Sequence, residues 1–159
     1  MRSLKRPKPV WFTISESELN KWFQERVGVT KQVWYESAAC NFLMAHSNLI
    51  CPDAKYTWSE LFLGTLEEKG QLRPDLIFES STQLWIFEVK YPINEKQMFG
   101  EGDWKGYGVE DQLDSYFDRI MELGWWKGKK IILAVFWVYG DTIRKRKKFA
   151  EDNRLLNKT

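Results

Sequence analysis

The 159-residue chain is predicted to form a single α/β domain, in which helices flank a central mixed sheet that contains a β-hairpin. Two stretches, 14–28 and 109–124, place apolar residues at helical spacing, whereas 129–140 is a continuous apolar run of strand character. Residues 73–90 consist of two apolar runs around a short polar stretch, a pattern typical of a hairpin. The length fits one core, and we expect the domain to occupy residues 10–159.

The composition excludes several classes of protein. Hydrophobic residues make up 43% of the chain and charged residues 29%, as in an ordinary globular domain, and the net charge is only +2. Cys40 and Cys51 belong to no CxxC or Cys/His cluster, so we expect neither a zinc site nor a disulfide scaffold. The sequence has no signal-peptide pattern and no apolar span. We therefore expect an intracellular protein with no membrane partner.

The N-terminal part is predicted to contain a flexible basic arm and two helices. Residues 1–9 are basic, and their two prolines disfavour regular structure. Ser15 and Glu18 have capping-box spacing at the start of a first helix, which Gly28 ends. A second helix is expected over residues 31–47.

The segment at 56–70 is compatible with two structures. Thr57 and Glu60 have the spacing of a capping box, and the apolar residues after them fit a helix. The same residues fit a strand that turns at 67–70 (EEKG). We favour the strand, because this turn then sets up a hairpin with residues 71–80.

The hairpin in residues 73–90 places three charges where a buried pair of strands would otherwise be apolar. A turn at the polar stretch 80–83 (SSTQ) pairs residues whose numbers sum to 163, which puts Asp75 directly opposite Glu88. The β-carbons of directly opposed residues are about 4.5–5.5 Å apart, and like charges there are destabilising. Lys90 projects from the same face as Glu88, because side chains alternate along a strand.

The C-terminal half is predicted to contain a loop, a helix and a buried strand. Residues 91–110 are glycine-rich without a period, which indicates a long loop. A helix follows from Val109 to Gly124, and 129–140 forms the buried strand. The basic tail is expected to begin as a helix.

Two opposed carboxylates beside a lysine indicate a metal site with hydrolytic chemistry. Carboxylate oxygens from the two strands can chelate Mg²⁺ or Mn²⁺, which keep several waters of their own. Such a metal activates a water and stabilises charge on a phosphate. Lys90 can orient or help deprotonate that water, or stabilise the developing negative charge.

These residues resemble the signature of the PD-(D/E)xK nuclease superfamily. Pro74-Asp75, followed after twelve residues by Glu88-Val89-Lys90, matches the signature in order and spacing. Gln112 and Tyr116, one turn apart on the next predicted helix, match the QxxxY motif of the RecB-like, Cas4-like and λ-exonuclease-like branch. The resemblance covers roughly residues 30–140.

The resemblance implies a restriction-endonuclease-like core and a role for each matching residue. Asp75 and Glu88 would be metal ligands, the Val89 carbonyl a possible further ligand, and Lys90 the catalytic lysine. The family often adds a ligand from the first core helix, for which Glu36 and His46 are both candidates, and we prefer His46. The small size suggests a stand-alone nuclease of viral, plasmid or archaeal origin.

Two basic regions favour a nucleic-acid substrate, and we expect double-stranded DNA. Clustered lysine and arginine neutralise phosphates and release counterions, although terminal charge runs are more commonly just solvated. Trp104 and Tyr107 in the glycine-rich loop are candidates for stacking on bases or for packing the loop down. The basic side chains are Lys5, Arg6, Arg144, Lys145, Arg146, Lys147 and Lys148.

Three alternatives compete with a nuclease. The first is an ordinary hairpin with an edge aspartate and a surface Lys–Glu pair. The second is a non-catalytic nucleic-acid-binding module with a nuclease-like fold, and the third is a metal-dependent phosphoesterase that acts on nucleotides. The sequence does not decide between DNA and RNA or between endonuclease and exonuclease action, and it does not give the oligomeric state.

Overall fold

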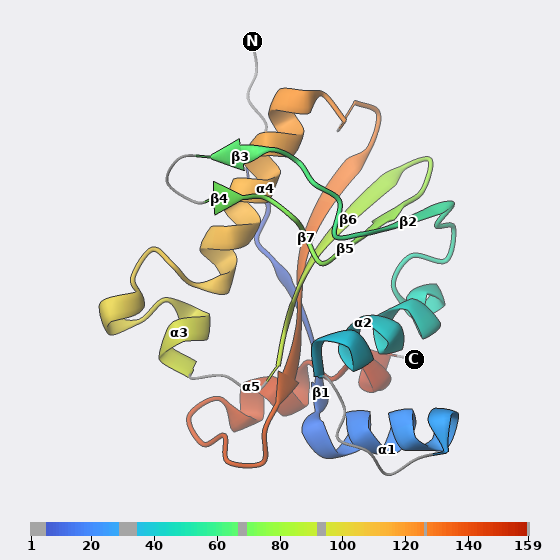
Figure 1. The fold of residues 1–159 in the computed structure, drawn as a ribbon, viewed down its shortest axis with the longest axis vertical. Coiled ribbons are helices and arrows are strands. Elements are labelled where there is room, and N and C mark those ends of the chain that lie inside the picture. Colours follow the sequence, from blue (N-terminus) through green and yellow to red (C-terminus); the bar gives the residue numbers. More distant parts are fainter. Residues whose placement is uncertain (1–5, 29–34, 67–69, 92–94, 126, 159) are drawn as a thin grey trace.

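A five-stranded mixed sheet forms the centre of the protein (Figure 1). The computed structural model describes residues 6–28, 35–66, 70–91, 95–125 and 127–158. The strands lie in the order β1 (Val10–Ser15), β7 (Lys130–Tyr139), β6 (Gln83–Lys90), β5 (Leu76–Glu79) and β2 (Tyr56–Ser59). β1, β7 and β6 are parallel, whereas β5 is antiparallel to both β6 and β2. The α/β class with a mixed sheet is therefore confirmed.

Helices cover both faces of the sheet and create two apolar clusters (Figure 1). The helix α4 (Val109–Leu123) and the small hairpin β3 (Thr65–Leu66)–β4 (Gly70–Gln71) lie on one side, and α1 (Glu16–Val27) and α2 (Tyr35–Ala45) on the other. The remaining elements are α3 (Glu95–Phe99), α5 (Lys147–Asp152) and the short 3-10 helices η1 (Ser47–Leu49), η2 (Gly102–Trp104) and η3 (Leu155–Lys158).

The alternation of side chains along β6 decides which face carries the charged residues. Leu84 and Ile86 join the cluster under α4, whereas Phe87 and Val89 join the cluster under α1 and α2. Glu88 continues the first series and therefore belongs to the face covered by α4.

Several predicted elements are confirmed. Ser15 caps α1 by accepting a hydrogen bond from the Glu18 backbone at 3.1 Å. Gly28 and Gly124 end α1 and α4 in the left-handed conformation, both with φ 72°. The β5–β6 pairs run from Leu76 with Phe87 to Glu79 with Leu84, so each pair sums to 163 as predicted.

The described residues of the 56–71 region form the short strands β2, β3 and β4 and no helix, in line with the favoured interpretation, although the pairing differs from the prediction. β2 is antiparallel to β5 and forms an edge of the main sheet. β3 and β4 pair only with each other in a separate small sheet. The expected single hairpin is therefore divided between two sheets, and its predicted turn falls largely on 67–69, outside the described residues.

Two other predictions need correction. Residues 10–15 form the strand β1, which the sequence interpretation missed because the prolines before it and the helix cap after it dominate the local pattern. The segment expected to be a loop at 91–110 contains α3 and η2 in its described part. The second helix is described from Tyr35, and its expected start at 31–34 lies outside the described residues.

Glu79 ties the outer strands to the turn before β7. Its Oε1 accepts a hydrogen bond from Trp58 Nε1 at 3.0 Å, and its Oε2 accepts from Trp125 Nε1 at 2.9 Å and pairs with Lys129 Nζ at 3.0 Å. Burial alone would raise the pKa of Glu79, but the hydrogen bonds from Trp125, Lys129 and Trp58 outweigh it, and the net pKa is lowered.

Candidate active site

The predicted hairpin charges meet where β6 ends and β5 begins. Asp75 directly precedes the first β5 pair, and its Oδ2 accepts a hydrogen bond from the Val89 backbone N–H at 2.6 Å. The Asp75 carbonyl accepts a further hydrogen bond from the Glu60 backbone at 3.2 Å. These contacts fix Asp75 against the end of β6, next to Glu88 and Lys90.

Glu88 is a buried carboxylate with two polar neighbours. Its residue is 4% exposed. Tyr116 donates a hydrogen bond to Glu88 Oε2 at 3.2 Å, and Lys90 Nζ lies 3.9 Å from the same oxygen. Burial, and then the charge of Asp75 and a hydrogen bond with it, raise the pKa of Glu88 well above its usual value, against the opposing effects of Lys90 and Tyr116.

Tyr116 is brought into the site as the QxxxY motif suggested, whereas the structure gives Gln112 no defined contact there. The Tyr116 hydroxyl also lies 3.4 Å from the Arg73 carbonyl oxygen, so it can donate to either acceptor. Burial and the charge of Glu88 raise the pKa of Tyr116, which keeps it a proton donor. Gln112 is half-buried one turn earlier on α4, and no hydrogen bond joins its side chain to the described residues around Glu88.

An open pocket of about 330 Å³ lies over Asp75 and contains further carboxylates. Glu36, in the first turn of α2, lines it together with Asp75 and Glu60. Partial burial, and then the charge of Asp75 and a hydrogen bond with it, raise the pKa of Glu36. The pKa of the Cys40 thiol is raised to about 12, first by burial and then by the negative charges of Asp75, Glu36, Glu60 and Glu88. Both effects indicate a concentration of negative charge around this pocket.

Glu60 is a site residue that sequence reasoning missed. It lines the pocket and has a positive φ of 49°, which is uncommon for a residue other than glycine. Its segment was compatible with a helix or a strand, so the direction of its side chain could not be predicted from the sequence. Only the pairing of β2 with β5 brings this segment beside Asp75.

Of the two candidate ligands on the second helix, the structure brings Glu36 and not His46 beside Asp75. His46 Nδ1 lies 2.8 Å from the Phe42 carbonyl oxygen, and its ring stacks on Phe42 at a centroid distance of 4.1 Å. His46 follows Glu36 by ten residues, which is about 15 Å along a helix axis. The two side chains therefore cannot serve the same end of α2.

Several of the basic side chains already have partners within the protein. Arg6 Nε donates to Asp118 Oδ1 at 3.1 Å, which docks the residue on α4, and Lys5 lies outside the described residues. Arg146 binds Glu101 at 2.8 Å and lies 3.9 Å from the centre of the Phe99 ring. The basic residues exposed at 144–148 are Arg144, Lys145, Lys147 and Lys148.

The loop aromatics predicted as stacking candidates remain accessible. Trp104 and Tyr107 are both exposed, Tyr107 to 70%. Trp104 is 42% exposed, so part of its surface is covered, whereas Tyr107 is largely open to a ligand.

The carboxylates at this end of the sheet are donors that suit a hard divalent cation, although only Asp75 of the predicted pair lines the pocket itself. The described ranges contain no preformed group of three or more His, Cys, Asp or Glu side chains arranged to hold a metal ion. Asp75 and Glu88 nevertheless supply hard oxygen atoms, and Mg²⁺ commonly binds through one or two carboxylates while it keeps several waters. The raised pKa of Glu88 describes the same site without a cation, because a positive charge there would favour the ionised carboxylate.

Comparison of the chain with protein-family models, curated proteins and solved structures finds no match. No helix among the described residues is long and apolar enough to cross a membrane. Function must therefore be inferred from the chemistry of the pocket.

Proposed function

We propose that the protein is an intracellular, divalent-metal-dependent nuclease of the PD-(D/E)xK type, with a restriction-endonuclease-like core, that hydrolyses phosphodiester bonds in DNA. One observation carries the proposal. Glu88 is buried beside a second carboxylate and a lysine at the end of a sheet, next to an open acidic pocket. Perturbed carboxylates in a cleft are typical of functional sites.

Asp75 and Glu88 would hold the metal, with Glu36 as the additional ligand from α2 and the Val89 carbonyl as a further one. When bound, Mg²⁺ or Mn²⁺ supplies Lewis-acid stabilisation of the phosphate and lowers the pKa of a coordinated water. Tyr116 holds the Glu88 carboxylate by its hydrogen bond at 3.2 Å. Lys90 orients the attacking water or stabilises the negative charge that develops on the phosphate.

The burial of Glu88 argues against an ordinary hairpin. A surface Lys–Glu pair would leave both side chains in water, whereas the Glu88 side chain is only 5% exposed and Lys90 24%. A buried carboxylate beside a second one destabilises the fold. That arrangement is hard to explain unless a bound cation offsets the charge.

The same observation weighs against a binding module that does not cut. A module that only holds nucleic acid needs basic and aromatic side chains and gains nothing from clustered carboxylates. A phosphoesterase for nucleotides would need the same metal site. The exposed basic residues at 144–148 favour a polymer over a mononucleotide.

The decisive experiment incubates the purified protein with labelled circular and linear DNA, with RNA and with nucleoside monophosphates, in Mn²⁺ or EDTA. We expect cleavage of DNA in Mn²⁺ and none in EDTA. Lys90→Ala should cut DNA at least about 100-fold more slowly, because it loses charge stabilisation and keeps the metal ligands. Binding of DNA without cleavage in any metal would establish the non-catalytic module instead.

A further inference from the structure

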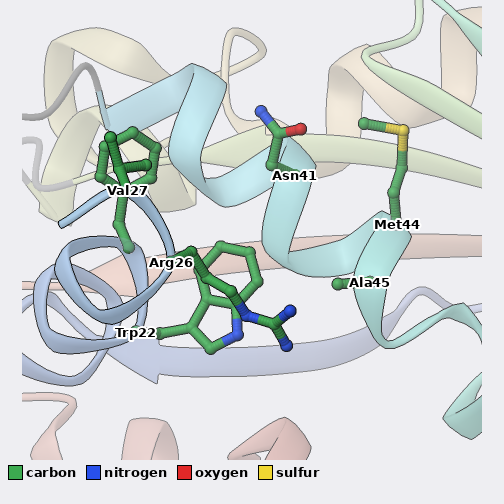
Figure 2. A pocket seen from close by; sticks show the side chains of 7 residues that line it. Trp22, Arg26, Val27, Asn41, Met44 and Ala45 are labelled. Carbon is green, nitrogen blue, oxygen red and sulfur yellow. The ribbon is translucent and has the colours of Figure 1, made fainter.

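A second groove lies between α1 and α2, on the same side of the sheet as the acidic pocket. Its volume is about 560 Å³, within the range of ligand-binding clefts. Figure 2 shows that its lining residues come from two neighbouring helices, with Trp22 and Arg26 on α1 and Asn41 and Met44 on α2.

The groove adjoins the acidic pocket. Asn41 and Met44 line both cavities, so these two side chains of α2 separate the groove from the pocket. With a rise of 1.5 Å per residue, Asn41 and Met44 lie roughly 7–12 Å along α2 from Glu36. A stacked nucleic-acid strand advances about 3.4 Å per nucleotide. The groove is therefore about two to four nucleotides from the carboxylates.

The chemistry of the groove differs from that of the acidic pocket. None of the described residues that line it carries a carboxylate, and its lining includes the cation Arg26. Val27 is 51% exposed and Met44 39%, so the groove presents apolar side chains to water. With a divalent cation on the carboxylates of the acidic pocket, as the proposed function requires, a ligand that suits both cavities would be apolar at one end and anionic at the other.

Trp22 and Arg26 form a stacking platform in the groove. The Arg26 guanidinium lies over the Trp22 ring, 5.3 Å from its centre. The Trp22 ring is itself fixed edge-on against the buried Phe42, with ring centres 5.2 Å apart. Arginine planes and aromatic rings are the surfaces on which unpaired bases stack.

We propose that this groove binds an unpaired base of a nucleic-acid strand whose phosphate lies at the acidic pocket, so that the preferred substrate has a single-stranded segment beside the cleavage point. The proposal rests on the proposed nuclease function. The base stacks on the Arg26–Trp22 pair and contacts Met44. Asn41 Nδ2 donates a hydrogen bond to the Ser37 carbonyl oxygen at 2.8 Å, so its Oδ1 is the atom that can accept from a base edge. An apolar side chain of a protein would fill the groove too, but it would have no use for the adjoining phosphate site.

The test measures binding by fluorescence anisotropy in Ca²⁺ with three probes of equal length: a single-stranded oligothymidine, the same strand with abasic sites, and a blunt duplex. Stacking is worth about 1–3 kcal/mol per base, which corresponds to roughly 5- to 150-fold in affinity. We expect wild type to prefer the base-bearing strand over the abasic strand by a factor in this range.

The variants Arg26→Glu and Met44→Glu should lose this preference. Each has a matched control outside the groove. Lys21→Glu makes the same charge change on α1, and Leu49→Glu replaces an apolar residue that, like Met44, is 39% exposed. Both controls should keep the preference for the base-bearing strand.

Equal binding of the base-bearing and abasic strands by wild type would overturn the inference, as would equal losses in the groove variants and their controls. A dimer in sedimentation that Met44→Glu converts to a monomer would assign the groove to a second copy of the chain, and this too would overturn the inference. If wild type still cuts DNA in Mn²⁺, only the groove proposal fails. If it neither binds the probes nor cuts any polymer, the nuclease proposal fails with it.

Discussion

Replacing Glu88 with Gln should make the metal-free protein more stable at neutral pH. Asp75 precedes the terminal pair of β5 with β6 and lies next to Glu88, and two unit charges about 5 Å apart would repel by about 3 kcal/mol at an effective dielectric constant of 20. Lys90, 3.9 Å from Glu88 Oε2, offsets part of this repulsion. We therefore expect the free energy of unfolding to rise by about 1–3 kcal/mol. At about 2–4 °C per kcal/mol, the melting temperature should increase by roughly 2–12 °C.

The stabilisation by Glu88→Gln should depend on pH. The pKa of Glu88 is raised in the folded protein by burial and by Asp75. The contribution of protonated Glu88 to the free energy of unfolding is therefore fully present below the unfolded pKa of about 4.3. This contribution is lost as the pH rises through the pKa of Glu88 in the folded protein. The difference between Glu88→Gln and wild type should be small near pH 4.5 and larger at pH 8.

The assay is thermal unfolding in EDTA at both pH values, with Glu25→Gln, an exposed glutamate on α1, as the control. The control should melt with wild type at each pH. A Glu88→Gln protein that melts below wild type at pH 8, or that shows no pH-dependent difference, would refute the assignment of Glu88 as a buried carboxylate under repulsion from Asp75.

Three further predictions concern other parts of the molecule. Glu36→Gln should reduce the stabilisation by Mn²⁺ in thermal unfolding and His46→Gln should not, because only Glu36 lies beside Asp75; the reverse order would restore His46 as the ligand. Replacing Lys147 and Lys148 with Gln should make the affinity for duplex DNA less dependent on salt. The slope of log affinity against log salt should fall in magnitude by about 0.9 for each phosphate contact that is lost. An unchanged slope would mean that both lysines are merely solvated. Glu79→Gln should destabilise the fold by about 1–3 kcal/mol at pH 7, because it weakens hydrogen bonds to a charged group. Because the pKa of Glu79 is lowered in the folded protein, its contribution to stability is present above the unfolded pKa and is lost as the pH falls through the folded pKa. Acid unfolding of wild type and of Glu79→Gln would detect this loss.

The hairpin could be predicted because its register depends on local features. The polar turn at 80–83 and the apolar runs on either side leave one pairing that buries both sets of side chains, and the structure has that pairing. Asp75, Glu88 and Lys90 follow from it directly. Tyr116 was a candidate only through the resemblance to the QxxxY motif, because its place on an amphipathic helix alone would predict a core residue.

The remaining features depend on residues that are distant in the sequence. β1 was missed because it is stabilised by its parallel pairing with β7, more than a hundred residues later. The choice between His46 and Glu36 could not be made from helical period alone, because only the structure shows that the pocket lies at the first turns of α2. Cys40, one turn after Glu36, lines the same pocket, whereas His46 follows the end of α2. Glu60 could not be placed without the tertiary structure.

The most direct test of the central claim is the rate of DNA cleavage by Glu88→Gln in Mn²⁺, measured beside wild type with both proteins shown to be folded. The Glu88 carboxylate is proposed to hold the metal at the expense of stability. The variant should therefore be at least as stable as wild type and yet fail to cut DNA. A folded Glu88→Gln protein that cuts DNA at the wild-type rate would show that the metal site, and with it the hydrolytic chemistry, lies elsewhere.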